Sequence, residues 1–123
     1  MMNPKTYTTA EANDLLPFLA PTLTELRDKF IRSSDLRAEV AREAAENGAS
    51  AKRERLQKTQ ARIAELIARI AEWELELRDI EAGLVDFPAV VDGAPAWLCW
   101  KLGEPRVGFW HPTTSGFADR RPL

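Results

Sequence analysis

The sequence changes character at Asp86-Phe-Pro88, which is followed by Trp97-Leu-Cys-Trp100, Gly103-Glu-Pro105, Phe109-Trp-His111 and Gly116-Phe117. Before this point the chain is long, charged and periodic at helical spacing, with few aromatic residues. After it come the only cysteine, the only histidine and three of the four tryptophans. We therefore expect any chemistry of this protein to lie in the C-terminal block, with the preceding helices as a scaffold or a dimerisation element.

Turn residues divide the C-terminal block, about residues 85–123, into short strands. Asp92-Gly93 lies between apolar residues and is typical of a two-residue hairpin, because a type I′ turn needs positive φ at both central positions. Residues 96–101 and 106–111 predict two more strands, joined at Gly103-Glu104-Pro105. The sequence therefore predicts a small three-stranded antiparallel β meander.

The register of the last two strands determines which side chains share a face of this meander. We expect Gly103-Glu104 to lie at the centre of the turn. An apolar face, which should pack on the helices, then pairs Leu98 with Phe109 and Trp100 with Val107. The opposite face pairs Trp97 with Trp110, Cys99 with Gly108 and Lys101 with Arg106. On this register Cys99 and His111 project from opposite faces, and a slip of one residue reverses that arrangement.

The preceding residues, about 8–84, have the period of two facing helices. Thr8 and Glu11 form a capping-box pattern for the first helix, and Pro17 and Pro21 predict a kink or a restart close to its beginning. Asn47-Gly48 should end this helix. The second helix carries a heptad pattern at Leu56, Thr59, Ile63, Leu66, Ile70, Trp73, Leu77, Ile80 and Leu84.

Folding the chain back at Asn47-Gly48 brings the two apolar stripes together. The expected pairs are Leu16 with Leu84, Leu23 with Leu77, Phe30 with Ile70 and Arg37 with Ile63. The sequence thus predicts one domain, residues 1–123, of mainly α class: a long antiparallel, coiled-coil-like helical hairpin with the three-stranded β meander at its C-terminus.

Composition and charge exclude several classes of function. The chain has 123 residues, 45% of them hydrophobic and 29% charged, and its formal net charge is −2. This balance gives no general attraction to nucleic acid or to an anionic membrane, and no aromatic residues alternate with the basic ones near the hairpin tip. The chain has no uncharged apolar run of about 18 residues, the length that a membrane helix needs. The single cysteine excludes an intrachain disulfide, so we expect a cytoplasmic protein.

Apolar residues outside the helical seam suggest a second copy of the chain. These residues are Leu15, Phe18, Ile31, Leu36, Ile67 and Leu75. Because a two-helix hairpin buries only one seam, we expect a homodimer or a higher homo-oligomer, such as a four-helix bundle.

Two hypotheses for the function of the C-terminal block remain open. The first is a non-enzymatic, self-associating interaction module whose surface includes Trp97 and Trp110 with their neighbours Lys101 and Arg106, although burial of these tryptophans in the dimer explains them equally well. The second is a divalent-metal or anion site, with a catalytic role as an option, built from Asp86, Glu104, His111 and Arg120.

In the second hypothesis, the metal or anion site, the metal ligands or acid–base groups would be His111, Glu104 and Asp86. Arg120 would hold an anion. Alternatively, His111 has only a structural role. Cys99 is either a nucleophile activated by neighbouring cations or, more commonly, a small buried hydrophobe.

Several motifs resemble a known family. They are Tyr7-Thr-x-x-Glu-Ala-Asn-x-Leu-Leu-Pro17, Gly83-Leu-Val-Asp-Phe-Pro88, Leu98-Cys-Trp-Lys-Leu-Gly-Glu-Pro105, Gly108-Phe-Trp-His111 and Gly116-Phe-Ala-x-Arg120-x-Pro-Leu123. Together they resemble the bacterial family "domain of unknown function 2203" across essentially the whole chain. The resemblance implies a bacterial, cytosolic helical hairpin, but no activity, substrate or ligand. The family motif includes Asp86, Cys99, Trp100, Glu104, Trp110, His111 and Arg120, which makes these residues the first choice for mutagenesis.

Overall fold

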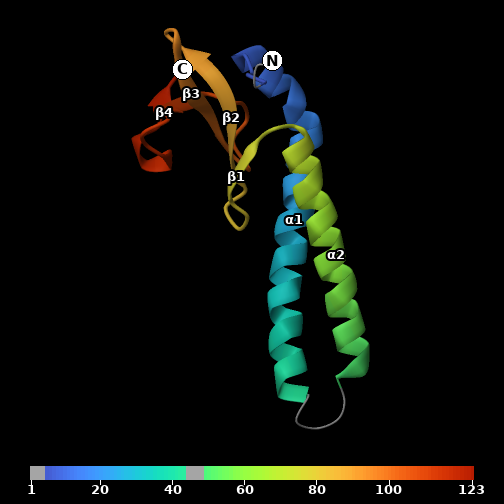
Figure 1. The fold of residues 1–123 in the computed structure, drawn as a ribbon. Helices are drawn as coiled ribbons and strands as arrows, with labels where there is room; N and C mark the ends of the chain where they lie inside the picture. The colour runs from blue at the N-terminus through green and yellow to red at the C-terminus, as the bar shows by residue number, and fades with distance from the viewer. Residues whose placement is uncertain (1–4, 44–48) are drawn as a thin grey trace.

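A computed structural model of the chain describes residues 5–43 and 49–123. In chain order the described elements are α1 (Thr9–Glu43), α2 (Ser50–Glu72), β1 (Glu76–Asp79), β2 (Leu84–Val91), β3 (Ala94–Lys101), β4 (Phe109–Pro112), a short 3₁₀ helix (Phe117–Asp119) and β5 (Arg121–Pro122). The strands form one antiparallel sheet in the order β1-β2-β3-β4-β5. Figure 1 shows this sheet beside one end of the two antiparallel helices, whose other end extends well beyond it.

The prediction of a mainly α fold with a three-stranded meander is wrong. The described residues form a mixed α+β fold with a five-stranded sheet, in which α2 already ends at Glu72. The backbone leaves the helix through Glu74, which has φ 60°, and continues as β1. Leu77, Ile80 and Leu84 fit the heptad by spacing, but Leu77 lies in β1 and Leu84 in β2, because pairing with β2 offers the backbone of β1 hydrogen bonds in place of those of a continued helix. The helical hairpin is therefore shorter than residues 8–84, and the β block begins before residue 85.

The start of α1 follows the sequence pattern. The Thr8 amide donates to Glu11 Oε1 over 2.9 Å, and the Glu11 amide donates to Thr8 Oγ1 over 3.1 Å, so the predicted capping box is confirmed. The helix does not restart at Pro17 or Pro21. Both prolines are exposed and lie four residues apart on one helix face, so the carbonyls that lose their amide donors can face water. The predicted helix end at Asn47-Gly48 lies outside the described residues.

Ion pairs show how the two helices lie against each other. Arg62 of α2 donates to both carboxylate oxygens of Glu25 of α1, over 2.6 and 2.8 Å. Closer to the tip, Lys52 pairs with Glu39 and Glu43. Because Arg62 lies opposite Glu25, the predicted seam pairs Arg37–Ile63 and Phe30–Ile70 are wrong. The pairs Leu23–Leu77 and Leu16–Leu84 are not helix–helix pairs either, since Leu77 and Leu84 lie in strands.

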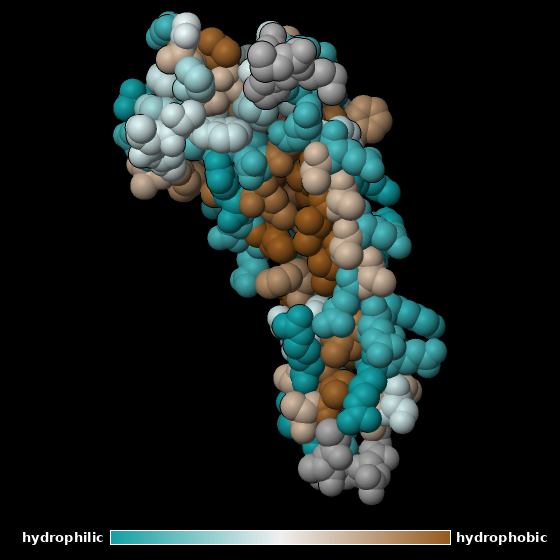
Figure 2. All heavy atoms as spheres, in the orientation of Figure 1, coloured by the Kyte–Doolittle hydropathy of each residue, from teal (hydrophilic) through white to brown (hydrophobic). Residues whose placement is uncertain are grey.

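The sheet places one face on the helices and leaves the other face away from them. Val85, Phe87, Leu98 and Trp100 pack with buried helix leucines in a single core cluster. The N-terminal segment is fixed to the same core, because the Tyr7 hydroxyl donates to the Trp73 carbonyl over 2.7 Å and the Tyr7 ring meets Phe87 edge to face. Figure 2 shows the resulting apolar band, which runs from below the sheet along the helices between hydrophilic margins.

The β2–β3 hairpin agrees with the prediction, and the β3–β4 register does not. Asp92 and Gly93 have φ values of 52° and 80°, as the predicted turn requires. In the next pair, however, Trp97 lies opposite His111, Leu98 opposite Trp110 and Cys99 opposite Phe109, one residue away from the predicted register. The predicted pairing of Trp97 with Trp110 is therefore wrong, and Cys99 and His111 share a face.

The register differs because the connection between β3 and β4 is not a two-residue turn. Residues 102–108 form a long loop whose backbone is fixed from outside the pair of strands. The Leu102 amide donates to the Gly83 carbonyl over 2.9 Å, and the Val107 amide donates to Asn13 Oδ1 of α1 over 2.8 Å. Contacts with distant residues therefore set the length of this loop.

Gly83 offers a test of this packing. It has φ +65°, and a Cβ at this position would come within 2.5 Å of Leu102 Cβ, whereas Gly93 has φ +80° with nothing within 4 Å. We expect Gly83→Ala to lower the free energy of unfolding by about 2–4 kcal/mol, from backbone strain and overpacking together. Gly93→Ala, the matched control, should cost only about 1 kcal/mol because the backbone strain acts alone. Urea unfolding monitored by circular dichroism measures both, and equal losses would contradict the described contact.

Candidate functional site

Three buried polar side chains converge on the face of the sheet that points away from the helices. Asp86 of β2 lies directly opposite Cys99 of β3, and His111 of β4 lies opposite Trp97, two residues before Cys99. Asp86, Cys99 and His111 are 2%, 1% and 2% exposed. One potential ligand atom from each lies within 4.8 Å of those of the other two. We refer to these three residues as the Asp–Cys–His cluster.

The two oxygens of the Asp86 carboxylate have different surroundings. Arg78 Nε donates to Oδ2 over 2.9 Å, and His111 Nε2 lies 2.9 Å from the same oxygen. Oδ1 is buried and has no hydrogen-bond partner among the described residues. A buried carboxylate oxygen without a partner is costly, because it has lost its water and gained nothing in exchange. Within the described residues, Asp86 therefore has one oxygen without a nitrogen or oxygen donor, and the Cys99 thiol is the weak donor that interacts with its carboxylate.

Both ring nitrogens of His111 face oxygen acceptors. Nδ1 lies 2.9 Å from the Pro112 carbonyl, and Nε2 faces Asp86. A neutral imidazole carries only one N–H, so a neutral ring donates to only one of these two acceptors. The contact of Nδ1 with the Pro112 carbonyl directs Nε2 toward the cluster.

Cys99 is a protonated thiol in this environment. Burial, followed by the negative charge of Asp86, raises the pKa of the thiol to about 11, while Arg120, whose Nη1 lies 4.0 Å from Sγ, opposes the shift. No His111 nitrogen is free to act as its base, since both face other acceptors. The geometry thus disfavours a cysteine nucleophile, and Cys99 would become a thiolate only beside an added positive charge.

The cluster opens into a pocket of about 340 Å³ between the sheet and residues 113–117. Its lining comprises Arg78, Leu84, Asp86, Trp97, Cys99, His111, Thr113, Ser115, Gly116 and Phe117. The Arg78 guanidinium stacks over the Trp97 ring, with 4.9 Å between Cζ and the ring centroid. A small ligand can therefore reach the three buried side chains from one side.

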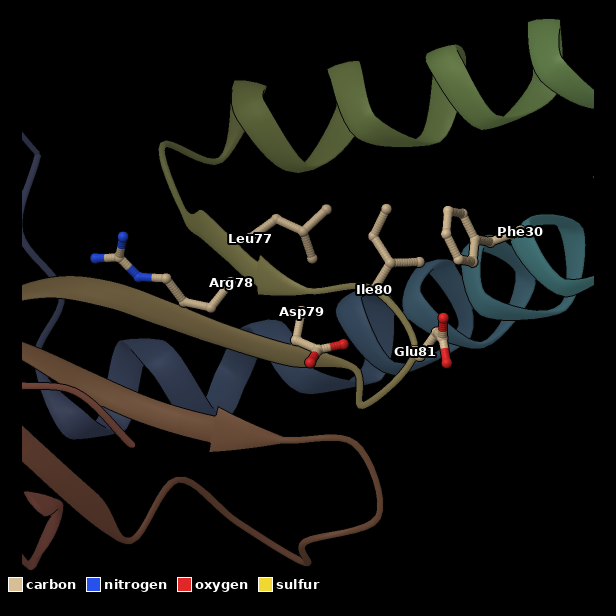
Figure 3. A pocket seen from close by; sticks show the side chains of 6 residues that line it. All are labelled: Phe30, Leu77, Arg78, Asp79, Ile80 and Glu81. Atoms are coloured by element: carbon tan, nitrogen blue, oxygen red, sulfur yellow. The ribbon is translucent and has the colours of Figure 1, made fainter. Parts of the chain in front are cut away.

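A second pocket lies on the helix side of β1. It has a volume of about 400 Å³ and is lined by Phe30, Leu77, Arg78, Asp79, Ile80 and Glu81. Figure 3 shows Leu77 and Ile80 on the same side as Phe30, whereas the Arg78 side chain extends away from them. The alternation along β1 thus directs Leu77 to the helices and Arg78 to the cluster.

Glu104 and Arg120, which were predicted to join Asp86 and His111, form a neighbouring ion pair instead. Arg120 donates to both carboxylate oxygens of Glu104, over 3.0 and 2.7 Å, and its guanidinium stacks between the rings of Phe109 and Phe117. Burial alone would raise the pKa of Glu104, but hydrogen bonds from Arg120 and the Lys101 amide hold that pKa below its usual value. This pair fastens the C-terminal segment to the loop after β3 and, through the Phe109 ring, to β4, and Arg120 contacts Cys99 of the cluster.

The four residues of the predicted interaction surface do not form one surface. Trp97 is half-buried on the cluster side, whereas Trp110 packs against the core cluster on the helix side with Arg121 over its ring. Lys101 and Arg106 are exposed.

Sequence reasoning missed Arg78, which the heptad pattern assigned to a helix surface. Its signal was the alternation Leu75-Glu-Leu77-Arg, which fits a strand as well as a heptad. Sequence reasoning also separated Cys99 from His111, because it placed the turn one residue away.

The described residues define a class of protein: an α+β domain in which a helical hairpin supports a five-stranded antiparallel sheet with a buried Asp–Cys–His cluster. The chain belongs to the family of uncharacterised conserved proteins DUF2203, whose family model matches residues 5–123. Comparisons with curated proteins and with solved structures find no match. Within the described residues, none of the helices has the length and apolar character needed to span a membrane.

The raised pKa of Cys99 predicts a specific pH dependence of stability in the metal-free protein. Because the pKa of the thiol in the folded protein, about 11, exceeds the ordinary cysteine pKa of 9.0, the thiol contributes stability that is complete below pH 9 and is lost as the pH rises toward 11. We expect the free energy of unfolding to fall across this interval by up to about 2 kcal/mol more in the wild type than in Cys99→Ala. Urea titrations at several pH values measure this difference, and parallel curves for the two proteins would contradict it.

Proposed function

We propose that this protein binds a divalent metal ion of the zinc type through Asp86, Cys99 and His111 and that the site serves metal-assisted hydrolysis. The observation that carries the proposal is the convergence of sulfur, nitrogen and oxygen ligand atoms within 4.8 Å at the floor of a pocket. Thiolate, imidazole and carboxylate form a donor set that zinc prefers. Three protein ligands with one accessible side are typical of catalytic rather than structural zinc sites.

The surroundings of each residue support its role as a ligand. Among the described residues, Asp86 Oδ1 accepts no hydrogen bond from nitrogen or oxygen, whereas Oδ2 accepts one from Arg78 Nε. The Pro112 carbonyl orients His111 with Nε2 inward, as an outer partner of a metal-binding histidine does. Cys99 is buried as a thiol, and a bound cation would stabilise its thiolate form.

A bound metal would lower the pKa of a coordinated water and polarise a carbonyl or phosphoryl oxygen. The chain's own residues would hold and orient the reactants. Arg78 keeps the Asp86 carboxylate in place, Trp97 and Phe117 supply apolar surface to the pocket, and the hydroxyls of Thr113 and Ser115 line it as hydrogen-bonding groups.

The test is the metal content of protein purified without a metal-affinity tag and then loaded with zinc, measured by elemental mass spectrometry. We expect about one equivalent in the wild type and at least a tenfold weaker affinity in Asp86→Asn, Cys99→Ser and His111→Ala, because each removes one of the three ligands. Glu104→Gln is the control, since Glu104 pairs with Arg120 outside the cluster.

Replacing zinc with cobalt provides a second, spectroscopic test of the ligands. A Cys99 with a purely structural role would give no absorption signal in this test. A thiolate-to-cobalt charge-transfer band should appear in the wild type and disappear in Cys99→Ser. If the wild-type protein holds no metal after loading, while circular dichroism shows that it is folded, the proposal is contradicted. The contacts among Arg78, Asp86 and His111 would then form a purely structural network.

Self-association is a second candidate function, favoured by large apolar side chains on the helix surfaces. Phe18, Ile31 and Ile67 are 64%, 49% and 39% exposed. Exposed apolar groups mark an interface between copies where they form a contiguous surface, and this candidate takes Ile31 of α1 and Ile67 of α2 as the centre of that surface. On this proposal the protein is a homodimer in the bacterial cytoplasm and acts as an assembly module, with no nucleic acid or membrane as partner.

Sedimentation velocity at micromolar concentration tests self-association. We expect a dimer for the wild type and a shift toward monomer for Ile31→Glu with Ile67→Glu, because charges would then lie in the apolar contact. Val90→Glu, which changes a similarly exposed residue on the sheet, is the control. A stable wild-type monomer would contradict this candidate.

A further inference from the structure

We infer that the pocket beside the Asp–Cys–His cluster takes a small ligand with an oxyanion group, a carboxylate or a phosphate, and that Arg78 binds this group. The inference rests on the proposed metal site, because the charge of the metal contributes to it. It begins from the position of Arg78, a residue that neither the core nor the pairing of the sheet requires.

Arg78 is fixed at one end of its guanidinium and free at the other. Its Nε donates to Asp86 Oδ2, and its planar group lies over the Trp97 ring. Its Nη atoms have no hydrogen-bond partner in the part of the chain that the structure describes, and the side chain is 42% exposed. A guanidinium held in this way presents two parallel N–H donors, which match the spacing of oxygens in a carboxylate or a phosphate.

The charge in the pocket favours an anion once the metal is bound. The Asp86 carboxylate and the Cys99 thiolate together balance a divalent cation, and Arg78 then remains as an uncompensated positive charge. The nearby carboxylate of Glu104 is neutralised by Arg120. Glu76 lies opposite Asp86 in the β1–β2 pair, and it and Asp79, the residue after Arg78, are exposed to water.

The opposite wall of the pocket supplies neutral donors and apolar area. Thr113 and Ser115 line it, and the Ser115 hydroxyl makes only a long contact of 3.4 Å with the Pro112 carbonyl, so it can turn toward a ligand. Trp97, Leu84 and Phe117 provide apolar surface for the carbon part of the ligand. The volume of about 340 Å³ limits this ligand to a small molecule.

The test measures binding of inorganic phosphate and of acetate to the zinc-loaded protein by isothermal titration calorimetry, with the metal content of each sample determined in parallel. We expect Arg78→Gln to weaken anion binding by at least about tenfold, because a charge-assisted bidentate contact is lost. Thr113→Val combined with Ser115→Ala should weaken it less, and Arg106→Gln, at an exposed arginine outside the pocket, should leave it unchanged. The stronger of the two anions identifies the class of ligand.

The outcomes separate the two proposals. Zinc-loaded wild type that binds neither anion, or binds them as well after Arg78→Gln, overturns this inference and leaves the metal site intact. A wild type that takes up no metal overturns the proposed function and this inference with it. Anion binding that requires both the metal and Arg78 supports both.

Discussion

The pairing of β2 with β3 is the constraint on which the rest of this structure depends. Eight residues of each strand pair in register from Leu84 with Lys101 to Val91 with Ala94, and the Asp92-Gly93 turn fixes that register. A shift by one residue would exchange the two faces of the sheet. In the observed register Val85, Phe87 and Leu98 meet the helices, and Asp86 and Cys99 lie together on the opposite side. The same few contacts thus build the core and the cluster.

Burying Asp86 requires a physical explanation. A carboxylate removed from water loses several kcal/mol of solvation, and partners must replace all of its hydrogen bonds to recover that loss. Arg78 and His111 both contact the same carboxylate oxygen, Oδ2. A network optimised for stability alone would satisfy the second oxygen or replace the group by an apolar side chain. An unused oxygen beside a buried thiol and an oriented imidazole is instead consistent with a site kept for a cation.

Sequence patterns predicted those parts of the fold that local chemistry determines. The Thr8–Glu11 capping box, the Asp92-Gly93 hairpin and the apolar faces of α1 and α2 follow from neighbouring residues. The end of α2 did not, because Leu77, Ile80 and Leu84 continue the heptad by spacing, whereas Leu77 lies in β1, Leu84 in β2 and Ile80 between these two paired strands. The β3–β4 register also depends on distant partners, since Asn13 and Gly83 hold the loop between these strands. Asp86 and His111 were predicted as neighbours, whereas the inclusion of Cys99 and Arg78 required the three-dimensional register.

The measurement that tests the central claim most directly is X-ray absorption at the zinc edge of the loaded wild-type protein. Coordination by Asp86, Cys99 and His111 predicts one sulfur at about 2.3 Å together with nitrogen and oxygen at about 2.0–2.1 Å, the distances typical of protein zinc sites. A spectrum with only oxygen and nitrogen neighbours would show that the metal lies elsewhere and would contradict a site built on the Asp–Cys–His cluster.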